Sequence, residues 1–284
     1  MLRYTQIHAR ARSIAQLGNV IAAMRGVAAA RAQQSRRQLD SVRMYADIVA
    51  DAISQVLPLA PAKAVDRQDN NGDNGVTALV LFGAEHGFAG AFSERVLADA
   101  GPDIAATVLL VVGDRALRLA QARGLKPVWS APMVSQLSNA PTLADRIGAE
   151  LYRHLHAGRI DRVEVAYARP LEMSGFEVVR QQLLPLDVAR FPAKDAQLAP
   201  LLNLAPAMLL ERLAGEYLFA QLNESIVHSF AAENLARLQT MSAARENIKQ
   251  RVASLTSEEQ LARQSEITAE IVELAAGAMS GKNP

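Results

Sequence analysis

A glycine-rich stretch, Gly83 to Gly90, is the part of this chain that most resembles a ligand-binding motif. It follows an apolar run of strand character and precedes a helical pattern, which is where dinucleotide-binding proteins place a phosphate-holding turn. Its glycines have the spacing GxxxGxxG instead of GxGxxG, and no acidic residue ends the next predicted strand. The spacing therefore favours a tight structural turn over a phosphate site. A GxxxxGK[ST] run is also missing from the sequence, so an ATP-binding P-loop is unsupported.

The histidines and carboxylates give little support for metal binding or acid–base catalysis. Of the five histidines, only His154 and His156 lie close together in the sequence, and an i, i+2 pair points to different faces of a helix. Glu258 and Glu259 are adjacent but belong to a long helical stretch that offers no cleft for proton transfer. The absence of cysteine excludes thiol catalysis and cysteine-ligated metals, and no serine stands in a GxSxG elbow. We expect no catalytic residue, cofactor or metal.

Charge is distributed unevenly between the two ends of the chain. Residues 1–50 carry eight arginines and two aspartates, a net charge of +6, whereas the chain from Pro206 onward carries seven basic and ten acidic residues, a net charge of −3. A basic helix can bind nucleic acid through phosphate contacts. Interleaved aromatic residues are lacking here, however, so the pattern favours pairing with the acidic end or with an acidic protein partner over nucleic acid.

Two long helices must position these charges. Residues 206–279 have no proline after Pro206, one internal glycine before Gly277, and mostly good helix formers. A single helix of this length would be about 110 Å long, against a radius of gyration of about 19 Å for a compact chain of this size. It must project, and its apolar seam needs a partner helix. The predicted seam residues are Val227, Ala231, Leu238, Met241, Ile248, Val252, Leu255, Ile267, Ile271, Leu274 and Ala278.

The N-terminal segment is the expected partner, because residues 5–57 also lack proline and repeat apolar residues with a seven-residue period. The predicted seam on this helix consists of Ile7, Ile14, Ile21 and Ala28, with Leu17, Met24 and Arg31 offset by three, then Val42, Tyr45, Val49 and Val56. We expect a coiled-coil helix over residues 1–57, antiparallel to a second one over residues 206–280.

Residues 76–190 predict a small Rossmann-like α/β domain inserted between the helices, after an exposed loop over residues 63–75. Apolar runs alternate with helical patterns, which indicates a parallel sheet with right-handed crossovers. An antiparallel hairpin is expected at the sheet edge, and Thr142 and Gly158 are expected to cap the third helix. The predicted strands are Thr77–Phe82, Thr107–Val112, Pro127–Ser130, Arg162–Ala168 and Phe176–Leu184, and the predicted helices are Phe92–Ala100, Arg115–Arg123 and Leu143–His156.

The seam residues also resemble a known family. Ser229–Asn247 is similar to the pattern S-x-x-x-E-N-x-x-R-x-x-x-M-x-x-A-x-x-N of the gamma subunits of rotary F-type ATP synthases, and Ala262–Ala278 resembles their ending A-R-Q-x-x-I-T-x-E-x-x-E-x-x-x-G-A. Arg12–Ala29 resembles their R-S…A-M-x-x-V-A-A segment, and Glu85–Ser93 stands where the family usually has D-R-G-L-C-G-G-F-N. The resemblance covers the whole chain. The chain departs from the family pattern at Ile21, Ala22, Arg245, Glu259 and Gln260, so it looks like a divergent member.

The resemblance implies a non-catalytic rotor. In that family the paired helices turn inside a ring of three alpha and three beta subunits, and the α/β domain sits on the membrane c ring beside the epsilon subunit. A rotor with an asymmetric surface drives the catalytic sites of the three beta subunits through different states. Met24, Arg25, Arg237 and Met241 are implied to face acidic beta-subunit segments. The full set of implied coupling contacts is Met24, Arg25, Glu233, Asn234, Arg237, Met241, Asn247, Arg263, Gln264, Thr268 and Glu270.

Location and alternatives follow from the same features. No apolar run reaches the length of a membrane span, and the N-terminus lacks the apolar core of a signal peptide. We therefore expect a peripheral protein on the cytoplasmic face of a bacterial inner membrane, which it meets only through partners. Either proton or sodium transport fits the sequence. The alternative function is a nucleotide-binding α/β enzyme with helical dimerisation arms, and a basic nucleic-acid binder is a third class.

Overall fold

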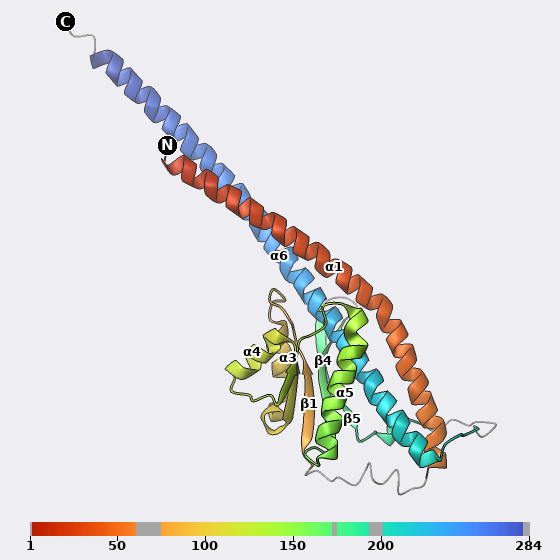
Figure 1. The fold of residues 1–284 in the computed structure, drawn as a ribbon. Helices are drawn as coiled ribbons and strands as arrows, with labels where there is room; N and C mark the ends of the chain where they lie inside the picture. Colours follow the sequence, from red (N-terminus) through yellow and green to blue (C-terminus); the bar gives the residue numbers. More distant parts are fainter. Residues whose placement is uncertain (1, 61–74, 172–174, 193–200, 281–284) are drawn as a thin grey trace. The chain divides into compact units, whose positions relative to one another are not determined.

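The computed structural model describes residues 2–60, 75–171, 175–192 and 201–280, with a long helix at each end of the chain (Figure 1). Helix α1 spans Leu2–Val56 and helix α6 spans Pro206–Ser280. The chain divides into two compact units, one made of residues 1–27 and 238–284 and the other of residues 28–237. Both helices contribute to both units. Most of the predicted loop, residues 63–74, lies outside the described residues.

In the first unit, α1 and α6 pack against each other as an antiparallel pair. Nδ1 of His8 lies 2.8 Å from Oε1 of Glu259, and a Cβ added to Gly18 would lie 3.2 Å from Cγ2 of Ile248. Residue numbers rise along α1 while those of the facing residues fall along α6, so the two helices run in opposite directions. The predicted antiparallel pairing of the two terminal helices is confirmed.

The predicted seam of α1 consists of two columns of residues, and the structure differs from the prediction in the second column, Leu17, Met24 and Arg31. Ile7, Ile14 and Ile21 are half-buried and Ala28 is buried, as predicted. Leu17 is instead 53% exposed, whereas Met24 and Arg31 of the same predicted column are half-buried. Half-buried residues also lie four positions after those of the first column, at Ala11, Gly18 and Arg25. Small residues carry little hydrophobic signal, and the sequence pattern therefore selected the larger residue next to them.

The seam of α6 also stops earlier than predicted. Met241 and Leu255 are buried, but Ile267, Ile271 and Leu274 are 47%, 60% and 74% exposed. The pairing of residue 8 with residue 259 places residue 2, where α1 begins, opposite about residue 265 when both helices advance 1.5 Å per residue. Beyond that point no described residue of α1 faces α6.

In the second unit the sheet has the order β3-β2-β1-β4-β5. Its first four strands are parallel, and β5 runs antiparallel to β4, as predicted. These strands read as continuous apolar runs because both faces of the sheet are covered. The strands are β1 Thr77–Phe82, β2 Val108–Val112, β3 Trp129–Ala131, β4 Arg162–Pro170 and β5 Phe176–Leu184.

Helices α3 (Phe92–Asp99) and α4 (Asp114–Ala122) cover one face of the sheet, and α5 (Ala140–His156) covers the other (Figure 1). Side chains of β1 alternate between the two cores: Leu79 and Leu81 belong to the α3–α4 side, and Val80 and Phe82 to the α5 side. The α5 side also contains Leu218, Leu222 and Ile226 of α6. The short 3₁₀ helices are η1 Leu57–Leu59, η2 Pro102–Ala106, η3 Leu137–Asn139 and η4 Val188–Arg190.

The start of α5 differs from the prediction. The helix begins at Ala140 and not at Leu143, with Asn139 at the N-cap position and no side-chain capping bond. Pro141 lies in the first turn, where its missing N–H costs no helical hydrogen bond. Thr142 is therefore inside the helix. At the other end, Gly158 has a φ of +61° and follows the last turn, which agrees with its predicted capping role.

No helix in the described part of the chain is both long enough and apolar enough to cross a membrane.

Candidate functional site

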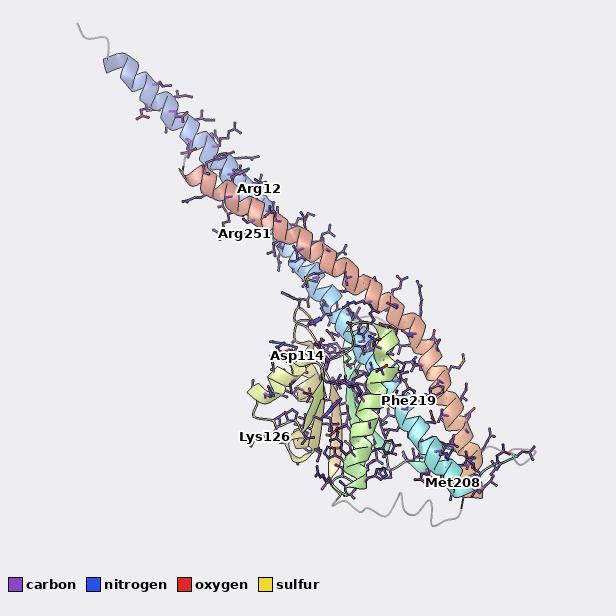
Figure 2. The ribbon with its side chains drawn as sticks, viewed as in Figure 1. Arg12, Asp114, Lys126, Met208, Phe219 and Arg251 are labelled. Carbon is purple, nitrogen blue, oxygen red and sulfur yellow. The ribbon has the colours of Figure 1, made fainter. Side chains whose placement is uncertain are left out.

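The loop after β1, residues 83–91, lies at the carboxyl ends of the parallel strands, where α/β proteins bind ligands. The chain's own Glu85 occupies this place. Its Oε2 accepts hydrogen bonds from the backbone nitrogens of Asp114, 3.1 Å away, and Met133, 2.7 Å away. Asp114 is the first residue of α4 (Figure 2), so an internal carboxylate holds the helix N-terminus at which a phosphate would bind. This geometry supports a structural turn over a phosphate site.

Packing between neighbouring loops explains the glycine after β2. Gly113 has a φ of +104°, and a Cβ added there would lie 2.7 Å from the carbonyl oxygens of Gly83 and Ala84. That distance is well inside van der Waals contact. Only glycine lets the loops after β1 and β2 approach this closely.

Arg237 of α6 holds the same loop from the other side. Its guanidinium donates to the carbonyl oxygen of Gly87 at 3.3 Å, to that of His86 at 3.3 Å, and to the carboxylate of Glu233 one turn earlier on α6. The second oxygen of Glu233 accepts from the backbone nitrogen of Glu85 at 3.4 Å. Arg237 and Glu233 are only 7% and 3% exposed. The ion pair is therefore buried, and both of its side chains also form hydrogen bonds with backbone groups of the loop.

Asn234 completes this cluster. Its side-chain oxygen accepts from Nη1 of Arg237 at 3.4 Å, and its amide nitrogen donates to the carbonyl oxygen of Phe230 at 2.8 Å. Asn234 is 1% exposed. Three residues implied as subunit contacts thus lie together and turn toward the loop after β1.

The contacts of Glu85 and Arg237 produce a loop that presents Phe88 to solvent. Phe88 is 66% exposed, and its φ is +64°. A bulky residue rarely adopts a positive φ, and such strain persists only where the surrounding structure holds it. Sequence reasoning missed Phe88. The exposure of its side chain and the positive sign of its φ depend on the loop's contacts with α6, about 150 residues further along the chain. The flanking glycines were the one local signal.

The other implied contact residues belong to the first unit and do not form a single cluster. Met241 is buried, and Met24 and Arg25 are half-buried. The hydroxyl of Thr268 donates to the carbonyl of Gln264 within the helix at 2.8 Å. The exposed members of this set are Asn247, Arg263, Gln264, Thr268 and Glu270.

A second polar cluster joins the two long helices inside the second unit. Nε of Arg43 on α1 lies 3.5 Å from Oε1 of Glu224 on α6, and His228 contacts both residues through Nε2. His228 also stacks on Tyr167 of β4, with ring centroids 5.7 Å apart. Burial by itself raises the pKa of Glu224, but the hydrogen bonds and positive charges of His228 and Arg43 outweigh burial and hold that pKa below its ordinary value. The cluster spans 185 residues of sequence.

Charge pairing between the two ends is limited. Among the side chains that the structure describes, Arg43 is the one arginine of residues 1–50 with a salt bridge to α6. Arg12 on α1 and Arg251 on α6 both point into solvent (Figure 2). Among these described side chains, most of the positive charge of α1 is therefore not paired with acidic side chains of α6.

The paired histidines have separate partners. His154 is buried and bonds through Nε2 to Oε1 of Glu150 at 3.0 Å, whereas Nδ1 of His156 contacts the carbonyl oxygen of Tyr152. Burial and the nearby Arg159 and Arg153 lower the pKa of His154. The described residues contain no group of three or more histidines or acidic residues arranged to hold a metal ion.

Comparison with known proteins identifies the family. Residues 3–280 match the family profile described as ATP synthase. The ATP synthase gamma chain of Synechococcus sp. (strain JA-3-3Ab) is 27% identical over 329 residues, covering 98% of this chain and 99% of the relative. That of Paraburkholderia phymatum is 26% identical over 296 residues, covering 96% and 97%.

Two solved structures share the fold. One chain from the Euglena gracilis mitochondrial ATP synthase, in a structure of OSCP, F1 and c-ring, has a TM-score of 0.65 at 11% identity, covering 98% of this chain and 94% of that one. One from the Tetrahymena thermophila mitochondrial ATP synthase, in a structure of central stalk and c-ring, has a TM-score of 0.56 at 18% identity, covering 79% and 99%. With the family profile spanning nearly all of its length, this chain belongs to the family of F-type ATP synthase gamma chains, as a divergent, non-catalytic rotor subunit.

Proposed function

We propose that this chain is the rotor of a bacterial rotary ATPase, assembled with a ring of three alpha and three beta subunits, an epsilon subunit and a membrane c ring. It acts at the cytoplasmic face of the inner membrane and meets the membrane only through these partners. The observation that carries the proposal is the antiparallel pairing of α1 and α6 in the first unit, through His8 with Glu259 and Gly18 with Ile248. A non-catalytic subunit can bias three catalytic sites only through unequal contacts with them.

The division of labour within the chain follows the same proposal. Residues 1–57 and 206–280 form the coiled-coil domains, and residues 76–190 form the α/β domain. The helices supply the moving contacts with the alpha and beta subunits. The α/β domain supplies the seat on the c ring and epsilon subunit.

The C-terminal end of α6 has the exposed apolar surface expected of a helix that turns inside an enclosing ring of subunits. Ile267, Ile271 and Leu274 are 47% to 74% exposed and lie where no described residue of α1 faces the helix. Large apolar side chains gathered on an exposed helix mark a surface that another protein covers. An enclosing ring of subunits would bury them.

Eight of the eleven coupling residues form two groups under this proposal. Asn247, Arg263, Gln264, Thr268 and Glu270 are exposed and would touch the ring directly. Glu233, Asn234 and Arg237 are buried, so they would act through the loop after β1 and its exposed Phe88. They are positioning residues in this arrangement.

Co-expression with candidate alpha and beta subunits tests the assignment. We expect a large complex with ATPase activity to co-purify with this chain. A chain that stays alone and binds ATP by itself would contradict the rotor assignment and favour the nucleotide-binding enzyme, although Glu85 already fills the phosphate position.

A further inference from the structure

One ring nitrogen in the second unit faces a hydrogen-bond donor and an acceptor at nearly equal distances. This atom is Nε2 of His228 on α6, which lies 3.3 Å from Nη2 of Arg43 on α1 and 3.4 Å from Oε1 of Glu224, one turn earlier on α6. A guanidinium nitrogen can only donate, and an ionised carboxylate can only accept. Nε2 either carries a proton or presents a lone pair, so it cannot bond to both neighbours at once.

The contact between Arg43 and His228 requires a neutral imidazole ring. Nε2 accepts from Arg43 only through its lone pair, which places the single ring proton on Nδ1. Nδ1 is buried and has no hydrogen-bond partner among the described side chains. In this state Arg43 also keeps its contact with Glu224, with 3.5 Å between Nε and Oε1. Arg43 therefore ties α1 to two residues of α6.

Protonation of His228 reverses the preference of Nε2. The nitrogen becomes a donor, and the ring becomes a cation. The new N–H faces Nη2 of Arg43, a donor that carries the same sign of charge, and the carboxylate of Glu224. Repulsion then opposes the contact with Arg43, while a charge-assisted hydrogen bond strengthens the i, i+4 pair of Glu224 and His228 within α6.

Neighbouring side chains hold His228 and Glu224 in place during this exchange. His228 is 2% exposed, and its ring stacks on Tyr167 of β4 with 5.7 Å between the ring centroids. Oε2 of Glu224 accepts from Nε2 of Gln221 at 3.4 Å, and Gln221 accepts in turn from Gln181 of β5 at 2.8 Å. The side chain of Arg43 is instead 50% exposed, so it has room to turn into solvent.

The carboxylate of Glu224 stays charged over the pH range in which histidine titrates. Burial raises its pKa, but His228 and Arg43 outweigh burial and hold that pKa below its ordinary value. Histidine is the side chain whose charge ordinarily changes between about pH 5 and 8. Glu224 is therefore available as an anion to whichever of the two cations binds it.

The remaining titratable and charged groups near the ring keep their charge in this range. Tyr167 of β4 lies against the plane of the ring, and Arg169 of the same strand and Arg190 of η4 act on its hydroxyl. Burial and Glu224 raise the pKa of Tyr167 more than these arginines and Arg43 lower it, so the hydroxyl stays neutral. Arginine stays protonated in proteins.

We propose that His228 is a proton-dependent switch for the contact between α1 and α6 in the second unit. While His228 is neutral, Arg43 bonds to it and to Glu224 and ties the two helices together. When His228 gains a proton, Glu224 pairs with it inside α6, and Arg43 leaves. Acid therefore loosens α1 at this point. The proposal goes beyond the rotor function and does not depend on it, since every member of the cluster belongs to this chain.

Nuclear magnetic resonance of the full isotope-labelled chain tests the switch. At about pH 7.5, the ring of His228 should be the tautomer that carries its proton on Nδ1. The Nε–H group of Arg43 should show a restricted side chain at about pH 7.5 and a mobile one at about pH 5.5. Arg37, an exposed arginine of the same helix, is the internal control and should be mobile at both pH values.

Arg43→Gln measures the same coupling from the other side. If a proton on His228 expels Arg43, then Arg43 must oppose that proton by the same factor. We expect the midpoint of the His228 titration to rise by about 0.5 pH unit in Arg43→Gln, about a threefold change in proton affinity. The matched control, Arg37→Gln, should leave the midpoint unchanged. His228→Gln should abolish the pH dependence of Arg43 mobility, because glutamine does not titrate.

Three results would each overturn the proposal: a ring protonated on Nε2 at about pH 7.5, an Arg43 side chain equally restricted at both pH values, or a midpoint that Arg43→Gln leaves unchanged or lowers. A pH-dependent mobility of Arg43 that persists in His228→Gln would also overturn it. In that case another titrating group would control the contact.

Discussion

Arg237 and Glu233 form a buried ion pair whose other hydrogen bonds go to the loop after β1 and to Asn234. Removing one member of a buried pair leaves the other charge desolvated, which costs about 3–5 kcal/mol. We expect Arg237→Ala to lower the free energy of unfolding by about 3 kcal/mol. Amide hydrogen exchange should also accelerate at His86 and Phe88, because the loop loses its anchor.

The matched control is Arg245→Ala on the same helix. Arg245 is exposed, so its removal should change the free energy of unfolding by less than about 0.5 kcal/mol. Urea denaturation of both variants measures the difference. Equal losses in the two variants would show that the buried pair does not stabilise the loop.

Glu224 gives the chain an acid-sensitive contact. Its pKa is lowered in the folded protein by His228 and Arg43, against the opposing effect of burial. A lowered pKa contributes stability above the ordinary value of 4.5 and loses it as the pH falls through the folded-state value. We expect Glu224→Gln to flatten the fall in unfolding free energy below about pH 4.5. An unchanged slope between the two proteins would contradict this assignment.

Met24 tests the proposed coupling contacts. Substitution by lysine adds a charge at a half-buried position on α1 and should lower coupling efficiency while leaving assembly largely intact. The measurement is the ratio of ATP-driven ion pumping to ATP hydrolysis in the assembled complex. Met44→Lys, at a 64% exposed position of the same helix, is the control. A ratio that stays constant while both rates fall would remove Met24 from the contact set.

At the scale of the elements, two glycines of α1 behave oppositely because only one faces α6. An added Cβ at Gly18 would already crowd Ile248 at 3.2 Å, whereas Gly26 has open space around it. We expect Gly18→Leu to destabilise the helix pair by about 1–3 kcal/mol through overpacking. Gly26→Leu should instead stabilise the helix by up to about 1 kcal/mol, since glycine is a poor helix former.

Thermal or urea unfolding, followed by circular dichroism, measures both glycine variants. The opposite signs are the decisive result. If Gly18→Leu proved as stabilising as Gly26→Leu, the register that pairs residue 18 with residue 248 would be wrong.

At the scale of the whole molecule, the α/β domain has the topology of a nucleotide-binding fold but places its own carboxylate at the phosphate position. The backbone nitrogens of Asp114 and Met133 are both used by Glu85. An incoming phosphate would have to displace this carboxylate and would meet its negative charge. We expect titration calorimetry to detect no ATP binding to the isolated chain with a Kd below about 1 mM. A tighter Kd would support the enzyme alternative.

The sequence by itself determined the secondary structure and much of the family assignment. All five strands begin and end within about two residues of their predicted bounds, and β1 and β5 match them. Apolar runs, glycines and prolines act over a few residues, so they can be read without knowing distant contacts. The patterns around Ser229–Asn247 and Ala262–Ala278 likewise needed no coordinates.

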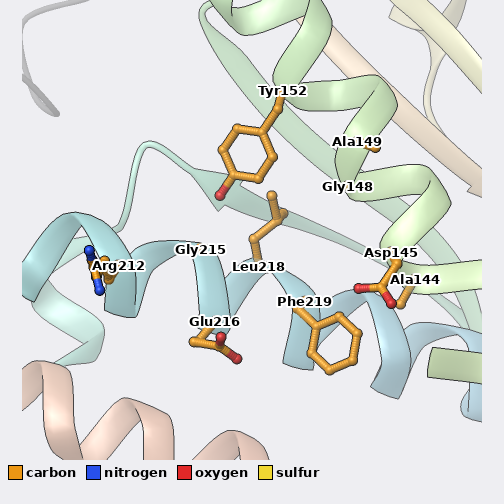
Figure 3. A pocket seen from close by; sticks show the side chains of 10 residues that line it. All are labelled: Ala144, Asp145, Gly148, Ala149, Tyr152, Arg212, Gly215, Glu216, Leu218 and Phe219. Atoms are coloured by element: carbon orange, nitrogen blue, oxygen red, sulfur yellow. The ribbon is translucent and has the colours of Figure 1, made fainter. Parts of the chain in front are cut away.

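Only the tertiary structure decided which side chains on these elements are buried, exposed or hydrogen-bonded. It placed Gly18 instead of Leu17 in the seam, turned Arg237 inward onto the loop that exposes Phe88, and put Glu85 where a phosphate would bind. It also left a groove between residues 144–152 of α5 and residues 212–219 of α6, with Gly148 and Gly215 in its lining (Figure 3). Each of these outcomes depends on how residues far apart in the sequence come into register, and no local pattern of residue types carries that information.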